Sequence, residues 1–347
     1  MSELPADPGP ADLRASVAAA MDAKTKPPGS LGRLESLAAD LAVATGTAHP
    51  VVDPARVIVF AGDHGVASDG VSVFPAEVTA QMCANFAGGG AAVAVLARSV
   101  GAGLEVVDVG VAADLTHIDG IVHAKVAHGT ANLRHGPAMD QAGLDAAVEV
   151  GREVVRRAVS DGQRLVALGE MGIGNTTSAA ILIGLLTGSA AADVTGPGTG
   201  LDPERLAAKQ EVVAAALQRL APLADDPASC LGHVGGFEIA ALVGAVLESR
   251  SHRMPVLVDG FIVTAAALVA CRMAPGVRRQ LIFAHRSAEP GHRVALDALD
   301  AAPLLDLGMA LGEGSGAALA LPVLRAACDI VADMATFADA GVSGACP

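Results

Sequence analysis

The 347-residue sequence has no tryptophan and no tyrosine, and only seven phenylalanines. Basic residues are also scarce: 23 lysines and arginines against 37 aspartates and glutamates give a formal net charge of −14. Nonspecific nucleic-acid binding needs a basic surface, and base stacking needs exposed aromatic rings. These shortages argue against a nucleic-acid-binding protein. They also mean that a flat aromatic ligand must lie between aliphatic, methionine and phenylalanine side chains.

The five cysteines are scattered, and no CxxC or CxxH pair occurs. They are Cys83, Cys230, Cys271, Cys328 and Cys346. This pattern predicts reduced thiols in a cytoplasmic protein, without a disulfide framework or a zinc site. The sequence also lacks a Gly-x-Ser-x-Gly elbow and a cysteine beside a plausible histidine partner, which disfavours hydrolases that use a covalent nucleophile.

The mean hydropathy of +0.48 raises the question of membrane spans. The two long uncharged stretches, 80–97 and 171–192, carry amide side chains, hydroxyls or glycine clusters where a span must be apolar. The first 26 residues contain four acids and no basic region followed by an apolar run. We therefore expect neither a membrane span nor a signal peptide.

Short apolar runs alternate with alanine-rich segments of helix length. The predicted strands cover 57–60, 104–109, 165–168, 256–258 and 281–284. Largely apolar strands separated by helices predict an α/β fold, a parallel sheet covered on both faces. Predicted helices at 11–24 and 31–45, the second capped by Ser30, and a helical tail after about 303 flank this pattern. We expect segments 1–50 and 301–347 to form one small helical domain beside a sheet domain at 51–300.

Polar residues collect after the strands and not before them. The residues in question are Asp63, His64, Glu170, Asp259 and His285. In open α/β sheets, ligands bind at the carboxyl ends of the strands. Any one of these residues could be an ordinary loop residue, but their recurrence favours a shared site.

The segment LGEMGIGNTTS (168–178) runs from a strand through three glycines into a helix near Thr176. Glycines let a phosphate approach the backbone, and the free N–H groups of the helix can bind it. The segment is neither a Walker A loop nor a dinucleotide fingerprint, and a turn that only packs the helix on the sheet is the alternative. Phosphate would repel Glu170, so this residue is expected to face a sugar.

Two later segments carry single charged residues of interest. TGPGTGLD (195–202) ends at Asp202, a good N-cap for a helix that follows. Lys209 lies two turns into that helix and is either a phosphate partner or a solvated lysine. In LGEGSGA (311–317), Glu313 lies between glycines in an apolar region. If it is desolvated, its pKa rises and it becomes a better general base; otherwise it is an exposed loop residue.

The segment 60–82 offers a mixed apolar and polar pocket. Its candidates are Ser72, Phe74, Gln81 and Met82, for which ordinary packing is the alternative. Asp63 and His64 suggest a metal site at first sight, but no further ligand with suitable spacing lies nearby. The run His285-Arg286-Ser287 and His292 are either ligands at the sheet edge or helix caps, and His233 is expected to be structural.

Eight segments taken together resemble the nicotinate-nucleotide–dimethylbenzimidazole phosphoribosyltransferase (CobT) family, in order and over nearly the whole chain. They are KPPGSLGRLE (26–35), AGDHGVASDGVSVFPAEVTAQM (61–82), LGEMGIGNTT (168–177), TGPGTGLD (195–202), HVGGFEIA (233–240), VDGFIV (258–263), AHRSAEPGH (284–292) and LDLGMALGEGSGA (305–317). The departures are conservative, such as Ser315 where the family often has threonine.

The resemblance implies a Rossmann-like sheet with a small helical domain, and a homodimer whose pockets are completed near the interface. It implies transfer of 5-phosphoribose from nicotinate mononucleotide to 5,6-dimethylbenzimidazole, with no metal or redox cofactor. The implied catalytic residues are Glu313, as general base, and Glu170, near the ribose. The implied phosphate and ribose contacts are Gly172, Gly174, Asn175, Thr176, Thr177, Gly198 and Lys209. The implied base pocket comprises Asp63, His64, Ser72, Phe74, Gln81, Met82 and Leu311.

Other functions remain open at this stage. A dinucleotide-dependent oxidoreductase would need a glycine fingerprint in the first strand–helix turn, and Gly62-Asp63-His64-Gly65 does not fit it. A non-catalytic module could bind nicotinate mononucleotide without consuming it, and an enzyme of the same kind could use another azole or a purine as acceptor.

Overall fold

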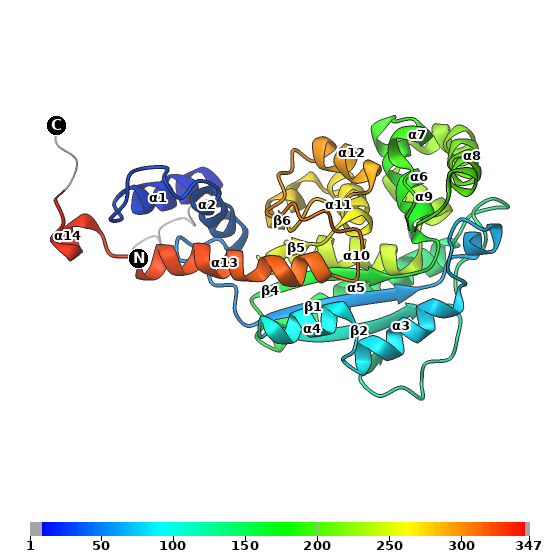
Figure 1. Cartoon of the computed structure of the whole chain (residues 1–347), viewed down its shortest axis with the longest axis horizontal. Helices are drawn as coiled ribbons and strands as arrows, with labels where there is room; N and C mark the ends of the chain where they lie inside the picture. Colours follow the sequence, from blue (N-terminus) through cyan, green and yellow to red (C-terminus); the bar gives the residue numbers. More distant parts are fainter. Residues whose placement is uncertain (1–8, 199, 344–347) are drawn as a thin grey trace, which may run out of the picture.

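The computed structural model describes residues 9–198 and 200–343, so Thr199 and Cys346 lie outside the described residues. Six parallel strands form one sheet in the order β3-β2-β1-β4-β5-β6 (Figure 1). They are β1 (Ala55–Gly62), β2 (Gly103–Gly110), β3 (Ile121–His123), β4 (Leu165–Met171), β5 (Val256–Val258) and β6 (Leu281–Phe283). The predicted α/β class with a parallel sheet is confirmed.

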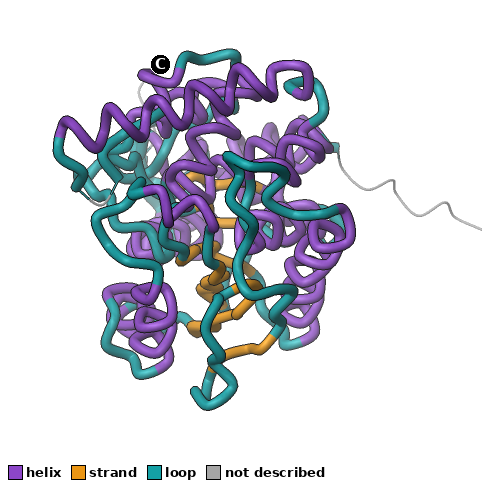
Figure 2. The backbone as a smooth tube through the Cα atoms, turned by 90° about the vertical axis from the view of Figure 1, so that its right-hand side faces the viewer, coloured by secondary structure: helices purple, strands orange, loops and turns teal. Residues whose placement is uncertain are grey.

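The strand order reverses between β1 and β4, which places a topological switch point at their carboxyl ends. In the register of this pair, Phe60 lies opposite Glu170 and Ala61 opposite Met171. Figure 2 views the molecule from the side to which β1 points, and loops cross in front of the strand ends there. This end of the sheet is therefore where a ligand site is expected.

Alternate side chains of the strands enter two separate cores. Ile58, Phe60 and Leu168 face a core shared with helices on one side of the sheet. Val57 and Val59 face the other core. The central strand β4 is buried along its whole length, which explains why its sequence is apolar without alternation.

Helices cover both faces of the sheet. The first core holds α5 (Gln141–Ser160), α6 (Asn175–Thr187), α8 (Pro203–Leu220), α9 (Pro227–Val234), α10 (Phe237–Ser249), α11 (Phe261–Met273), α12 (Pro290–Ala298) and the short α7 (Ala191–Val194). The second core holds α1 (Pro10–Asp22), α2 (Arg33–Thr45), α3 (Glu77–Ala87), α4 (Ala92–Ser99) and α13 (Ser315–Asp333), while α14 (Phe337–Ala340) ends the described chain. The alanine-rich composition of α10 and α11 reflects burial on nearly all sides.

The helices of the two chain ends pack together. Helices α1, α2 and α13 contact one another, and the Lys24 ammonium donates to the Val331 carbonyl at 2.9 Å. Their apolar residues are continuous with the second core of the sheet, including Val57 and Val59. The predicted cap at Ser30 is wrong: residues 29–32 form turns, with Gly32 N–H donating to the Gly29 carbonyl, and α2 starts at Arg33 after Gly32.

Two segments are long and apolar enough to cross a membrane by length and composition alone, Glu77–Ser99 and Ser315–Asp333. The first includes the stretch 80–97 and consists of two helices, α3 and α4, separated by residues 88–91. The second is α13, which packs on the sheet. Core helices pass the same test, so these segments are weak evidence for a span.

Candidate active site

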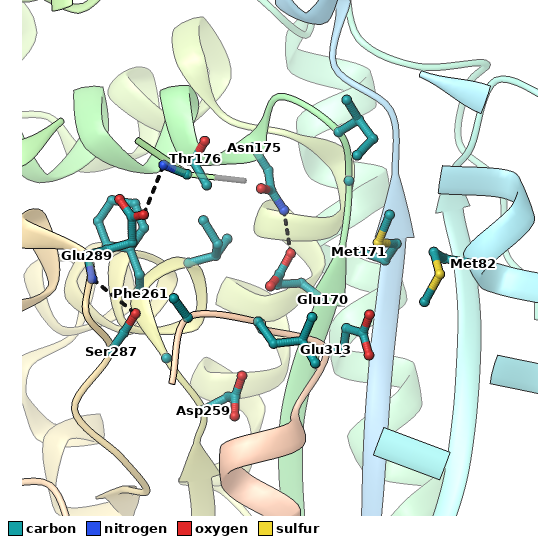
Figure 3. Close-up of a pocket in the computed structure, with 18 of the residues that line it drawn as sticks. Met82, Glu170, Met171, Asn175, Thr176, Asp259, Phe261, Ser287, Glu289 and Glu313 are labelled. Atoms are coloured by element: carbon teal, nitrogen blue, oxygen red, sulfur yellow. Dashed lines mark hydrogen bonds between the residues drawn. The ribbon is translucent and has the colours of Figure 1, made fainter. Parts of the chain in front are cut away.

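A cavity of about 370 Å³ opens at the carboxyl ends of the central strands (Figure 3). Its acidic lining residues are Glu170, Asp259, Glu289 and Glu313. Its large apolar lining residues are Phe74, Val78, Met82, Met171, Ile173, Phe261, Ile262 and Leu311. The cavity thus combines an apolar slot, of the kind expected without tyrosine or tryptophan, with four carboxyl groups.

Glu170, near the end of β4, carries one of these carboxyl groups. The Asn175 side-chain amide, at the start of α6, donates a hydrogen bond to it. Burial and repulsion from Glu238 and Asp259 raise the pKa of Glu170 to about 8. In the free protein at neutral pH this acid therefore holds its proton, and a cation placed beside it would favour the ionised form.

Glu313 is held in a strained backbone conformation. Its φ is 65°, and those of Gly312 and Gly314 are 84° and 85°, so three successive residues are left-handed. Asp259 fixes this turn by accepting from Gly314 N–H at 3.2 Å and Ala317 N–H at 2.8 Å. A left-handed conformation is unfavourable for a residue with a side chain and persists where the surroundings over-determine it. The turn therefore fixes the direction in which the Glu313 carboxyl group points.

The environment of the Glu313 carboxyl suits a general base. It is buried, and Oε2 has no hydrogen-bond partner among the described residues. Burial, and then repulsion from Asp259, raise its pKa to about 7. A base whose pKa lies near the working pH combines a useful ionised fraction with a strong tendency to accept a proton. The exposed-loop alternative for this residue is wrong.

The opposite wall of the cavity offers groups suited to an anion. Helix α6 begins at Asn175 after Gly174, whose φ of 99° calls for glycine. Thr176 and Gly198 line the cavity, and the buried Lys209 lies behind them, donating to Thr176 Oγ1 at 2.8 Å. Burial lowers the pKa of Lys209 to about 8, and its side chain is only 1% exposed. The solvated-lysine alternative is therefore wrong.

The structure brings together many of the residues singled out in the sequence. Those that line the cavity are Phe74, Met82, Glu170, Gly172, Asn175, Thr176, Gly198, Asp259, His285, Ser287, Leu311 and Glu313. Those outside its lining are Asp63, His64, Ser72, Gln81, Gly174, Thr177 and Lys209. Gln81 is exposed on α3, and Ser72 is only partly buried in the loop before it.

Asp63 and His64 are placed away from the predicted base pocket. The His64 ring is buried between Glu238, with Nε2 to Oε1 at 2.6 Å, and Ser178, with Nδ1 to Oγ at 3.0 Å. Asp63 accepts from Ala112 N–H at 2.8 Å. These contacts tie the end of β1 to α10, α6 and the loop after β2, which is a structural role.

Sequence reasoning missed several lining residues, chiefly Glu289 and Phe261, whereas Ser287 was one of its candidates at the sheet edge. The segment AHRSAEPGH was recognised, but nothing in it marked Glu289 as a cavity residue. His292, the more conspicuous candidate there, accepts from Ser287 N–H at 2.8 Å, and burial lowers its pKa to about 3. It is a neutral residue that positions Ser287.

Across the described ranges, no group of three or more histidine, cysteine, aspartate and glutamate side chains is arranged to hold a metal ion. The carboxyl groups of the cavity face an apolar slot, and their nearest partners are backbone amides, an asparagine, a lysine and, for Asp259, His285 at 3.8 Å. This arrangement is suited to an organic ligand that develops positive charge.

Comparison with known proteins shows which family this chain belongs to. A family model described as "Phosphoribosyltransferase" matches residues 7–342. The nicotinate-nucleotide–dimethylbenzimidazole phosphoribosyltransferases of Pseudomonas putida W619 and Pseudomonas aeruginosa PAO1 are each 52% identical, over 92% and 97% of this chain and 91% and 95% of their own. The crystal structure of CobT from Thermus thermophilus is 47% identical with a TM-score of 0.92, covering 96% of this chain and 99% of its own. This chain therefore belongs to the nicotinate-nucleotide–dimethylbenzimidazole phosphoribosyltransferase family.

Proposed function

We propose that this protein transfers 5-phosphoribose from nicotinate mononucleotide to 5,6-dimethylbenzimidazole, giving α-ribazole 5′-phosphate and nicotinate, for assembly of the cobalamin nucleotide loop. The observation that carries the proposal is the pairing of Glu313 and Glu170 in one cavity that also has an apolar slot. Family membership supports the same reaction.

Departure of nicotinate needs no general acid, because the leaving ring is a pyridinium that becomes neutral as the bond breaks. Positive charge then develops on the ribose in an oxocarbenium-like transition state. Glu170 and Asp259, both buried at the cavity, are placed to stabilise that charge. Fixed carboxyl groups in a dry site act strongly because they need little reorganisation.

The acceptor brings its own lone pair, so the protein's main task is to remove a proton. As one nitrogen of the benzimidazole bonds to C1′ of the ribose, the N–H of the other nitrogen becomes strongly acidic. In the proposed mechanism Glu313 Oε2, which has no hydrogen-bond partner among the described residues, takes that proton. The apolar side chains Phe74, Met82 and Leu311 would sandwich the ring.

The 5′-phosphate is assigned to the start of α6 and to Gly198, with Lys209 behind them. Backbone N–H groups at a helix N-terminus and a buried ammonium are both suited to phosphate. This anchor sets the distance from the phosphate to C1′ and so positions the reacting carbon near the two glutamates.

We also propose a cytoplasmic homodimer. Phe74 and Leu311 line the cavity but are 49% and 56% exposed, and Leu307 nearby is 60% exposed. Large apolar side chains gathered at the mouth of a pocket are typical of a surface that another chain covers. The family resemblance, in which the pockets are completed near the dimer interface, supports the same arrangement.

The reaction is tested by incubating the purified protein with nicotinate mononucleotide and dimethylbenzimidazole and measuring released nicotinate by mass spectrometry. Release that depends on both substrates supports the proposal. Binding of the nucleotide without release would indicate a non-catalytic module. Parallel reactions with other azoles and with purines identify the preferred acceptor.

Replacing Lys209 by alanine is expected to weaken binding of nicotinate mononucleotide by about tenfold or more, as loss of a hydrogen bond to a charged group does. The dissociation constant is measured by calorimetry. Lys26→Ala is the matched control, because Lys26 is also buried and pairs with Glu35 at 2.8 Å, remote from the cavity. If Lys209→Ala, like the control, lowers only the melting temperature, Lys209 is structural.

A further inference from the structure

Glu289 is a cavity acid that the proposed reaction does not use. It occupies the N-cap position of α12, yet its side chain makes no cap hydrogen bond. Instead, Oε1 accepts from Gly198 N–H at 3.0 Å (Figure 3). The Gly198 amide is one of the donors that we assign to the 5′-phosphate.

The second donor on this wall also lies close to Glu289. Lys209 Nζ lies 3.4 Å from the Gly196 carbonyl and donates to Thr176 at 2.8 Å. Its charge favours the ionised form of Glu289, opposing the effect of burial. The carboxyl group of this residue therefore accepts from the same backbone amide, and lies in the field of the same lysine, that suit a phosphate.

The second carboxyl oxygen of Glu289 has space around it but no hydrogen-bond partner among the described residues. This atom, Oε2, is buried. A β-carbon at Gly196 would lie 2.2 Å from this oxygen, so the glycine leaves the space that it fills. The Glu289 carboxylate and a bound phosphate would share one set of donors in a water-poor site and would repel each other strongly. Protonation of one of them removes this repulsion at the lowest free-energy cost.

We propose that Glu289 occupies the donors of the ligand phosphate in the free protein and takes up a proton when the 5′-phosphate of the nucleotide arrives at Gly198 and Lys209. The inference rests on the proposed function and adds a specificity-determining residue to it. The proton comes from solvent, and the neutral carboxyl group can then donate a hydrogen bond to a phosphate oxygen.

The charged groups around Glu289 set the sign of the pH dependence. Lys209 on α8 faces it, and the other cavity acids lie across the slot. Asp193 on α7 and Arg272 on α11 are exposed, and His292 on α12 is neutral because burial lowers its pKa to about 3. Burial raises the pKa of Glu289 itself. Where Glu289 is ionised in the free protein, binding consumes a proton, so affinity falls as pH rises.

The test measures proton uptake by calorimetry between pH 7.0 and 8.5, above the second phosphate ionisation near 6. Nicotinate mononucleotide is titrated into the full-length protein in buffers of different ionisation enthalpy. Nicotinate riboside, which lacks the phosphate, serves as the control ligand because it meets the same cavity acids. We expect the nucleotide to take up as much as one proton more than the nucleoside.

The variant Glu289→Gln keeps an acceptor for Gly198 N–H but cannot ionise. Its extra proton uptake should fall below that of the wild-type protein, because only Lys209, whose pKa of about 8 the arriving phosphate raises, still takes up a proton. Uptake equal to that of the wild-type protein would assign the proton to Lys209 and overturn the proposal. At pH 8.5 the variant should bind the nucleotide about tenfold or more tightly than the wild-type protein does. Equal uptake for both ligands in the wild-type protein would overturn the proposal, and this comparison needs no variant. Equal or weaker binding by Glu289→Gln would also overturn it. Absence of nicotinate release in the turnover assay would instead refute the reaction itself.

Discussion

Replacing Glu313 by glutamine is expected to lower turnover by about 10²-fold or more while leaving the dissociation constant of nicotinate mononucleotide close to the wild-type value. Glutamine has nearly the same shape but cannot take the proton from the acceptor ring. Both residues have a side chain, so the strain of the left-handed turn at φ 65° is unchanged. The measurement is kcat from nicotinate release, together with calorimetric binding of the nucleotide. Near-normal turnover would remove Glu313 from the role of base.

The pH profile adds a second signature to this prediction. With a pKa of about 7 in the free protein, the wild-type base is protonated in acid, so kcat/KM should rise through pH 7 and level off above it. The glutamine variant should lose this rise. A useful companion is Glu313→Gly, which relieves the strained turn between two glycines; it should be as inactive as the glutamine variant.

Several features of the fold and the site could be predicted because the information is local. The strand 165–168 and the glycines after it are contiguous, and so they place Glu170 and the start of α6 together. Glu313 could be singled out because its flanking glycines are visible in the sequence. Strand β3 was missed because, unlike the equally short β5 and β6, which are buried throughout, it is fully buried only at Ile121 and lacks an apolar run.

The contacts that decide the remaining roles are distant in sequence. The partners of His64 are 114 and 174 residues away, and only the folded chain shows that they remove its ring from the cavity. Gly198 and Glu289 are 91 residues apart, which hid the link between two segments that were each recognised. Lys209 was ambiguous for the same reason, since burial by α6 and the loop before α8 depends on the fold.

The buried carboxyl groups of the cavity are costly to ionise in the folded protein. We therefore expect the stability of the protein to depend on pH. Burial raises the pKa of Glu170 from 4.5 to about 8. Below about pH 4.5 the carboxyl is protonated in both folded and unfolded protein, and the full stability is present. Between these values only the unfolded chain releases the proton. The free energy of unfolding therefore falls as pH rises toward 8, by as much as about 1.4 kcal/mol per pH unit.

Replacing Glu170 by glutamine should flatten this decline and make the protein more stable than wild type at pH 8, while lowering its activity. Glutamine still offers an oxygen to Asn175, so packing is little changed. Urea unfolding at several pH values between 5 and 8.5 measures the effect, with Glu204→Gln, an exposed residue in the first turn of α8, as control. An identical slope in wild type and Glu170→Gln would contradict the prediction. Because Glu238, Asp259 and Glu313 repel Glu170, its removal also eases ionisation of these neighbours, so part of the gain comes from them.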